Sequence, residues 1–167
     1  KRDWSSDVCS SDLEVRAEGR TDWVLYGMPG EALFATIGGG TVRGQIRANE
    51  TNYTVIGTRL YSVTGAGIET DIGEIEGAEP VDMFFNGVQL CIVAELKSYS
   101  YDTVTLGLSE IADPNFEQAS GGDSLASYEI YAVKGTGRFR WRLVNSASFN
   151  ANDFATAEAE SDFLVAV

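Results

Sequence analysis

The stretch from Val42 to Ile75 constrains the fold most, because short runs of β-forming residues alternate in it with turn-forming residues. The runs that we expect to be strands are Arg43–Ala48, Tyr53–Ile56, Arg59–Val63 and Ile68–Ile75. Polar residues separate the first two runs, and Gly65-Ala66-Gly67 precedes the last. This order predicts a four-stranded antiparallel meander. So small a sheet cannot bury its apolar face by itself, so the unit needs partners.

The same order of strands and turns recurs later in the chain. Val81–Ile111 contains a second copy, in which Asn86-Gly87 is a strong hairpin signal. A weaker third copy runs from about Leu125 into the 150s. The spacing of roughly 35 to 45 residues is typical of β-propeller blades. We therefore predict an all-β fold of repeated antiparallel meanders, a partial β-propeller-like array of about three blades, with a β-sandwich as the alternative.

Several shorter segments carry separate predictions. Trp23–Tyr26 and Leu33–Ile37 have the composition of short strands. Gly38–Gly40 is expected to be a turn, because no Gly-Lys-Ser/Thr follows it. Ala119–Asp123 is rich in Gly and Ser and is interpreted as a loop. Asn150–Glu160 has the start signals of a short helix without a convincing apolar stripe.

Composition excludes several classes of site. The chain has 167 residues, a net charge of −13 and no histidine. A Ser-His-Asp triad and a histidine-based zinc site are therefore excluded within this chain, and the acidic balance argues against specific nucleic-acid binding. No stretch is long and apolar enough to span a bilayer, so no membrane partner is predicted. We predict no catalytic residues and no cofactor. We also predict no metal site, because the acids Asp153, Glu158, Glu160 and Asp162 lack the spacing of a calcium loop.

The segment Arg138–Leu143 alternates strictly between arginine and apolar residues. Phe139, Trp141 and Leu143 would face one way and form core, while Arg138, Arg140 and Arg142 would face the other way. The arginine row is either a solvent face paired with carboxylates, or a contact with an acidic partner subunit or a phosphate backbone. It is the candidate partner-contact site of the chain.

Two further side-chain patterns are interpreted as packing. Cys91 lies in a run that is apolar on both faces, so we expect an inert core thiol. Lys97, Tyr99 and Tyr101 share one face of a predicted strand. Aromatic rows of this kind bind sugars or stack bases in some proteins, but cross-strand packing is the favoured interpretation here.

Both ends of the chain differ from the rest. Lys1–Leu13 has no usable period, and it resembles translated sequencing-adapter read-through. We expect it to be a disordered, non-native leader in which Trp4 and Cys9 carry no function. The propeller-like domain is then expected over 14–167, and the apolar ending Phe163–Val167 predicts truncation within a strand.

Three groups of residues carry a family resemblance, in the correct order along the chain. They are Leu25-Tyr26-Gly27-Met28-Pro29-Gly30 with Leu33-Phe34-Ala35 and Val42-Arg43-Gly44, then Tyr53-Thr54-Val55-Ile56-Gly57 with Leu60-Tyr61-Ser62-Val63, then Gly135-Thr136-Gly137-Arg138-Phe139 with Asp153-Phe154-Ala155-Thr156-Ala157-Glu158. Together they resemble the packaged-DNA stabilisation protein, or tail hub, of short-tailed bacteriophages.

The resemblance implies a β-rich structural virion protein without enzymatic activity. Such a protein would be a head–tail connector or tail-hub component that helps to retain packaged DNA. Its expected partners are other phage tail and portal–adaptor proteins, in a homo-oligomeric ring assembled in the bacterial host cytoplasm. Two other function classes stay open at this point: a β-propeller carbohydrate-binding module that uses Tyr99 and Tyr101, and a glycoside hydrolase fragment, which would need two paired carboxylates.

Overall fold

The structure is a computed structural model that describes residues 12–15, 23–26 and 33–157. The chain divides into two compact units, Lys1–Phe34 and Ala35–Val167. In the first unit, β1 (Asp12–Val15) pairs antiparallel with β2 (Trp23–Tyr26), which confirms the strand expected at Trp23–Tyr26. The remainder of the predicted leader, including Trp4 and Cys9, lies outside the described residues.

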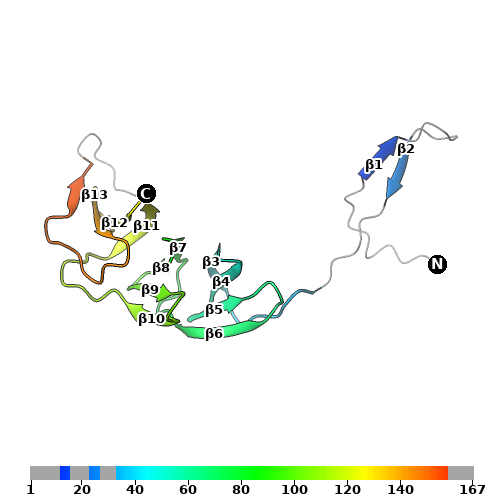
Figure 1. Cartoon of the computed structure of the whole chain (residues 1–167), viewed down its shortest axis with the longest axis horizontal. Helices are drawn as coiled ribbons and strands as arrows, with labels where there is room; N and C mark the ends of the chain where they lie inside the picture. Colours follow the sequence, from blue (N-terminus) through cyan, green and yellow to red (C-terminus); the bar gives the residue numbers. More distant parts are fainter. Residues whose placement is uncertain (1–11, 16–22, 27–32, 158–167) are drawn as a thin grey trace. The chain divides into compact units, whose positions relative to one another are not determined.

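The second unit consists of three four-stranded antiparallel sheets, in each of which every strand pairs with the next (Figure 1). The first sheet contains β3 (Val42–Ala48), β4 (Thr51–Ile56), β5 (Arg59–Val63) and β6 (Glu69–Glu74). The second contains β7 (Asp82–Phe85), β8 (Gln89–Val93), β9 (Ser98–Asp102) and β10 (Gly107–Glu110). The third contains β11 (Ala119–Leu125), β12 (Tyr128–Val133), β13 (Arg138–Leu143) and β14 (Phe154–Thr156). The predicted all-β array of repeated meanders is confirmed.

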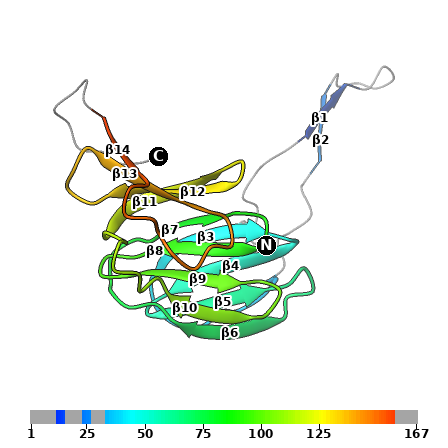
Figure 2. The same ribbon diagram turned by 60° about the vertical axis from the view of Figure 1, so that its left-hand side comes forward.

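The first and second sheets pack face to face, as Figure 2 shows. Val55 and Leu60 from the first sheet and Ile92 from the second have no exposed surface. The ring of Tyr101 lies 5.8 Å from the ring of Tyr53 across this interface. Tyr99 and Tyr101 are buried in the same cluster, which confirms that they pack in the core. Buried rings offer no face to a sugar, so the aromatic row gives no support to a carbohydrate site.

The opposite face of the second sheet packs against the third. Phe84 and Cys91 from the second sheet meet Tyr131 from the third, together with Phe149 from the connection between β13 and β14. Figure 2 shows this connection reaching down to the second sheet. Cys91 is fully buried, as expected, and burial raises the pKa of its thiol to about 12. The second sheet is therefore covered on both faces, as a blade inside a stack must be.

The segment Ala119–Asp123 is not a loop but the greater part of strand β11. It pairs with β12, and Gly122 donates its N–H to Asp82 Oδ2 at 2.8 Å. A Cβ on Gly122 would lie 2.6 Å from Phe84 Cε1, which is closer than atoms can approach. Gly122, which favours a loop in the sequence pattern, is instead needed for close approach of the third sheet to the second.

Two other local predictions are wrong. Leu33–Ile37 forms no strand, because no neighbouring strand pairs with it. The helix start expected at Asn150–Glu160 is replaced by β14 in its described part, where Arg138 lies opposite Thr156. The free edge of β13 supplies partners for the backbone groups of this segment, and no apolar stripe favours a helix there.

A buried arginine holds the first sheet to the segment that leads into the second. Arg43 is 6% exposed, and its guanidinium donates to four main-chain carbonyl oxygens. The acceptors are Glu79 O at 2.7 Å, Gly57 O and Ile75 O at 2.9 Å each, and Glu76 O at 3.1 Å. We call this arrangement the Arg43 clamp. It satisfies carbonyls that no strand would otherwise pair.

Candidate functional site

Two of the three arginines of β13, Arg140 and Arg142, are buried in the protein. Arg140 and Arg142 are 8% and 5% exposed, whereas Leu143 on the other face is 56% exposed. The prediction that the apolar face of this strand is core and that the arginine face meets solvent is therefore wrong for Arg140 and Arg142. The reason is that two carboxylates, Glu129 and Glu117, form ion pairs with the arginines on this face of the sheet. The pairing of the arginines with carboxylates is confirmed.

The first carboxylate, Glu129 on β12, is fully buried and saturated with donors. Arg142 Nε donates to Glu129 Oε2 at 2.6 Å, the Tyr131 hydroxyl to the same oxygen at 2.9 Å, and Asn86 Nδ2 to Oε1 at 2.6 Å. The Arg142 guanidinium also lies 5.1 Å from the centre of the Phe149 ring. Burial raises the pKa of Tyr131, so its hydroxyl remains a donor. Because Asn86 belongs to the second sheet, this network joins the two sheets.

The second carboxylate, Glu117, binds the other two arginines near the protein surface. Arg140 Nε donates to it at 2.7 Å and Arg138 Nη1 at 3.2 Å. The hydrogen bond from Arg140 is the main cause that lowers the pKa of Glu117. Both guanidinium groups lie over the Phe154 ring, at 4.8 Å for Arg138 and 5.6 Å for Arg140. A partner contact through this row stays a prediction, and Arg138, with 38% of its side chain exposed, is the member most open to one.

Sequence reasoning identified the arginines but not their partners. Glu129 lies directly opposite Arg142, in a strand whose other residues are mostly apolar or aromatic. A single acid at that position was the available signal for a buried ion pair. Glu117 lies outside the strands, and nothing in the pattern linked it to Arg140.

The other face of the third sheet is mostly apolar, with Asp123 opposite Ile130, and part of it is exposed. Leu125, Tyr128 and Leu143 are 67%, 45% and 56% exposed. Leu125 and Tyr128, together with Ile130 and Trp141, line a cavity of about 190 Å³. We call this surface the outer apolar face. Contiguous apolar surface of this kind marks interaction sites rather than ordinary solvent-facing surface.

The positive charges of the described chain are nearly all neutralised. On its surface, ion pairs join Arg47 to Glu50 at 2.6 Å, Arg59 to Asp71 at 2.8 Å, and Lys97 to Glu76 at 2.7 Å and to Glu110 at 3.0 Å. Within the described ranges, Arg43 and Lys134 are the cations without a carboxylate partner, and both bind main-chain carbonyls. The described surface therefore presents no cationic stripe of the kind that binds a phosphate backbone.

Neither of the two described cavities contains paired acids. The outer cavity has no carboxylate in its lining, and a polar cavity between the second and third sheets has Glu110. The described residues also contain no group of three His, Cys, Asp or Glu side chains that could hold a metal ion. They include no helix long and apolar enough to cross a membrane. The paired carboxylates that a glycoside hydrolase uses are thus not found in either cavity.

Comparison with protein families gives one match that spans nearly the whole chain. A family model named Phage_stabilise and described as "Bacteriophage P22 Gp10, beta-propeller" matches residues 13–167. A search of curated proteins gives no significant match.

Solved structures with a similar fold match the chain at low sequence identity. The WD40 domain of Neurospora crassa Pan2 matches with a TM-score of 0.51 and 14% identity, over 70% of this chain and 36% of that one. The N-terminal domain of Nup159 matches with a TM-score of 0.50 and 14% identity, over 71% of this chain and 31% of that one. These likenesses concern the fold alone, and the chain spans about a third of the length of each.

Proposed function

The chain belongs to the family described as the bacteriophage P22 Gp10 β-propeller, and we propose that it is a tail-hub or head–tail connector component that helps to retain packaged DNA in the virion. The family match over residues 13–167 is the observation that carries the proposal. Membership makes the chain a phage structural protein concerned with DNA stabilisation, and the position within the virion is the step that we add.

The electrostatics of the described residues support a role beside DNA without binding to it. The net charge is −13, and the arginines of β13 that could have bound phosphate are paired with Glu117 and Glu129. An acidic surface repels the phosphate backbone over about a Debye length. A wall of this kind around a DNA passage holds the duplex by closing its path rather than by binding it.

The outer apolar face supports an arrangement in which further sheets follow. Closed propellers have about four to eight blades, and the described chain contains three sheets. We propose that these sheets are blades of one propeller-like domain, expected over 14–167, and that another sheet covers Leu125, Tyr128 and Leu143. In that arrangement Leu143 would be buried by the next sheet, as residues of the second sheet are buried by the sheets on either side of it.

The partners follow from the same proposal. The protein would form a homo-oligomeric ring with other phage tail and portal–adaptor proteins as neighbours, and would be assembled in the host cytoplasm. Its role in this ring is mechanical, with no enzymatic step and no cofactor.

A phage that carries this gene provides the decisive test. Deletion of the gene should give heads that package DNA and then lose it, so that the genome becomes sensitive to added DNase, and a plasmid copy should restore protection. Heads that retain a DNase-resistant genome without the protein would overturn the proposal.

The electrostatic part is tested separately with purified protein. Fluorescence anisotropy with a labelled duplex should show no binding at moderate salt, because few counterions would be released. A micromolar affinity that weakens as salt is added would contradict it.

A further inference from the structure

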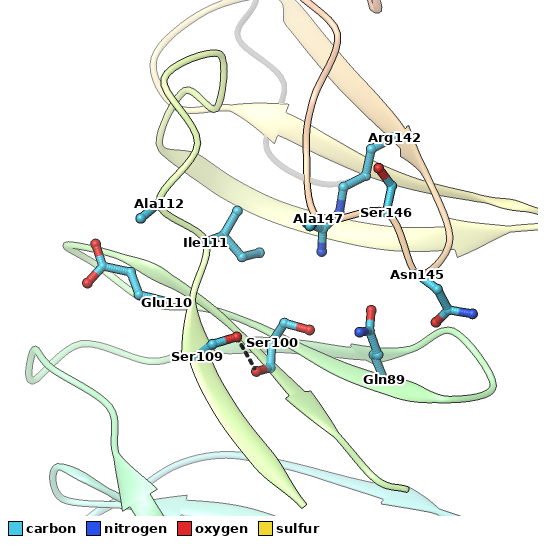
Figure 3. Close-up of a pocket in the computed structure, with 10 residues that line it drawn as sticks. All are labelled: Gln89, Ser100, Ser109, Glu110, Ile111, Ala112, Arg142, Asn145, Ser146 and Ala147. Carbon is cyan, nitrogen blue, oxygen red and sulfur yellow. Dashed lines mark hydrogen bonds between the residues drawn. The ribbon is translucent and has the colours of Figure 1, made fainter. Parts of the chain in front are cut away.

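A polar cavity of about 320 Å³ lies between the second and third sheets (Figure 3). Ser100 and Gln89 line it from the second sheet, Arg142 from β13, and Asn145 and Ser146 from the connection that follows β13. Figure 3 shows Arg142 directed down into this space, towards the strands that carry Ser100 and Gln89. Its volume falls at the lower end of the range for small-molecule sites, about 300–1,000 Å³.

Two polar atoms of the lining residues are buried and have no hydrogen-bond partner. They are Ser100 Oγ and Gln89 Oε1, and Ser100 as a whole is 8% exposed. A buried polar atom without a partner destabilises the folded state, so native proteins rarely keep one without a ligand or water. Arg142 directs Nε to Glu129, which leaves its terminal amino groups as donors towards the cavity.

The charges around the cavity are already balanced. Arg142 pairs with Glu129 at 2.6 Å, and Glu110 pairs with Lys97 at 3.0 Å. A ligand with a net charge would disturb this balance, and an anion would in addition meet the overall charge of −13. The cavity therefore favours a neutral polar group.

We propose that this cavity binds an amide group, supplied by a small amide or by a peptide bond or side-chain amide of a polypeptide. Ser100 Oγ and Gln89 Oε1 have almost no accessible surface, so a small rotation of each side chain must first turn them to the cavity. The carbonyl oxygen of an amide would then accept from the Ser100 hydroxyl and from a terminal amino group of Arg142. The N–H of the same amide would donate to Gln89 Oε1. One group thus supplies both kinds of partner that the lining lacks.

Other ligand chemistries fit less well. A carboxylate would satisfy Ser100 and Arg142, but it offers no donor to Gln89 and adds a third acid beside Glu110 and Glu129. An apolar group would leave both orphan atoms unpaired. Water satisfies the same atoms, so a hydrated cavity is the outcome against which the proposal is tested.

The test is a titration of isotope-labelled protein followed by NMR. The probes are N-methylacetamide as a model of a peptide bond, propionamide as a model of a side-chain amide, and acetate as the anionic control. We expect saturable shifts of the Gln89 side-chain amide with a Kd of about 1 mM for an amide probe, as fragments of this size allow. Preference for N-methylacetamide indicates a main-chain source, and preference for propionamide a side-chain source.

The chain provides a matched pair of variants. Ser98 lies two residues before Ser100 on β9, and its buried hydroxyl is also without a partner, but it does not line the cavity. Ser100→Ala should weaken amide binding roughly two- to ten-fold, and Ser98→Ala should leave it unchanged. Gln89→Met, followed through the main-chain N–H of Ser100 because the side-chain amide is lost, provides a second variant with the same expected loss.

Four results would overturn the proposal. They are shifts that stay linear with probe concentration, equal binding of acetate, equal weakening by Ser98→Ala, or a crystal soaked in the amide that shows ordered water only.

Discussion

The buried pair of Glu129 and Arg142 gives the sharpest prediction about stability. Substitution Glu129→Gln keeps the shape of the side chain but removes the charge that three donors share. Arg142, with 4% of its side chain exposed, would remain charged without a counterion, and either Tyr131 or Asn86 would face an amide N–H. The substitution therefore tests whether this network holds the second and third sheets together.

The magnitude follows from burial and from the number of bonds. Hydrogen bonds to charged groups contribute about 1.5–3 kcal/mol each, and removal of one partner of a buried pair costs about 3–5 kcal/mol. We expect Glu129→Gln to lower the free energy of unfolding by about 4 kcal/mol. This is a large part of the total of about 5–15 kcal/mol for a domain. The double variant Glu129→Leu with Arg142→Met should be clearly more stable than the sum of its single changes predicts, because no charge is left unpaired.

Urea unfolding followed by tyrosine and tryptophan fluorescence measures both quantities. The matched control is Glu50→Gln, which makes the same change in an ion pair whose carboxylate side chain is 90% exposed, and no measurable effect is expected there. A loss below about 1 kcal/mol for Glu129→Gln, which is the level of an exposed pair, or full additivity in the double variant would refute the reasoning.

Three further predictions follow from single contacts. Arg43→Lys should lower the free energy of unfolding by about 3 kcal/mol, measured by urea unfolding, because a single ammonium cannot reach four carbonyls in the plane of the guanidinium fork; an unchanged midpoint would contradict the clamp. Gly122→Ala should cost about 1–3 kcal/mol by contact with Phe84, whereas Gly65→Ala, with no atom within 4 Å of the new Cβ, should be neutral in the same assay. The Cys91 thiol should be unreactive towards alkylating reagents in the folded protein at pH 8 and should react on unfolding. The folded thiol keeps its proton up to about pH 12, while the unfolded thiol loses it near its usual pKa of 9.0. The stabilisation from this group is therefore full below pH 9 and declines above it. Cys91→Ala should remove this pH dependence.

The strand pattern could be predicted from the sequence because turns and β-forming residues are local signals. Arg59–Val63 and Arg138–Leu143 have the bounds that their alternation indicated. Asn86-Gly87 likewise lies between β7 and β8, as its turn chemistry indicated. The number of sheets follows from these local features, since each sheet is a run of consecutive strands.

The direction of a strand face could not be predicted in the same way. Alternation in β13 shows that two faces exist, but the face that meets the second sheet depends on Glu129 and Glu117, which come from other segments. The role of Gly122 is not local either, because it depends on contact with the Phe84 ring of the second sheet. The cavity beside Ser100 also depends on contacts between sheets, so no local sequence pattern predicts it.

The Arg43 clamp has a consequence for how the protein can change over evolutionary time. All four acceptors are peptide oxygens, which every amino acid carries. Substitutions at Glu79 therefore leave the Arg43 clamp intact, provided the path of the main chain is kept. The arginine itself has no such freedom. Substitutions should therefore be tolerated in the segment between the first two sheets, but not at Arg43, which binds its carbonyl oxygens.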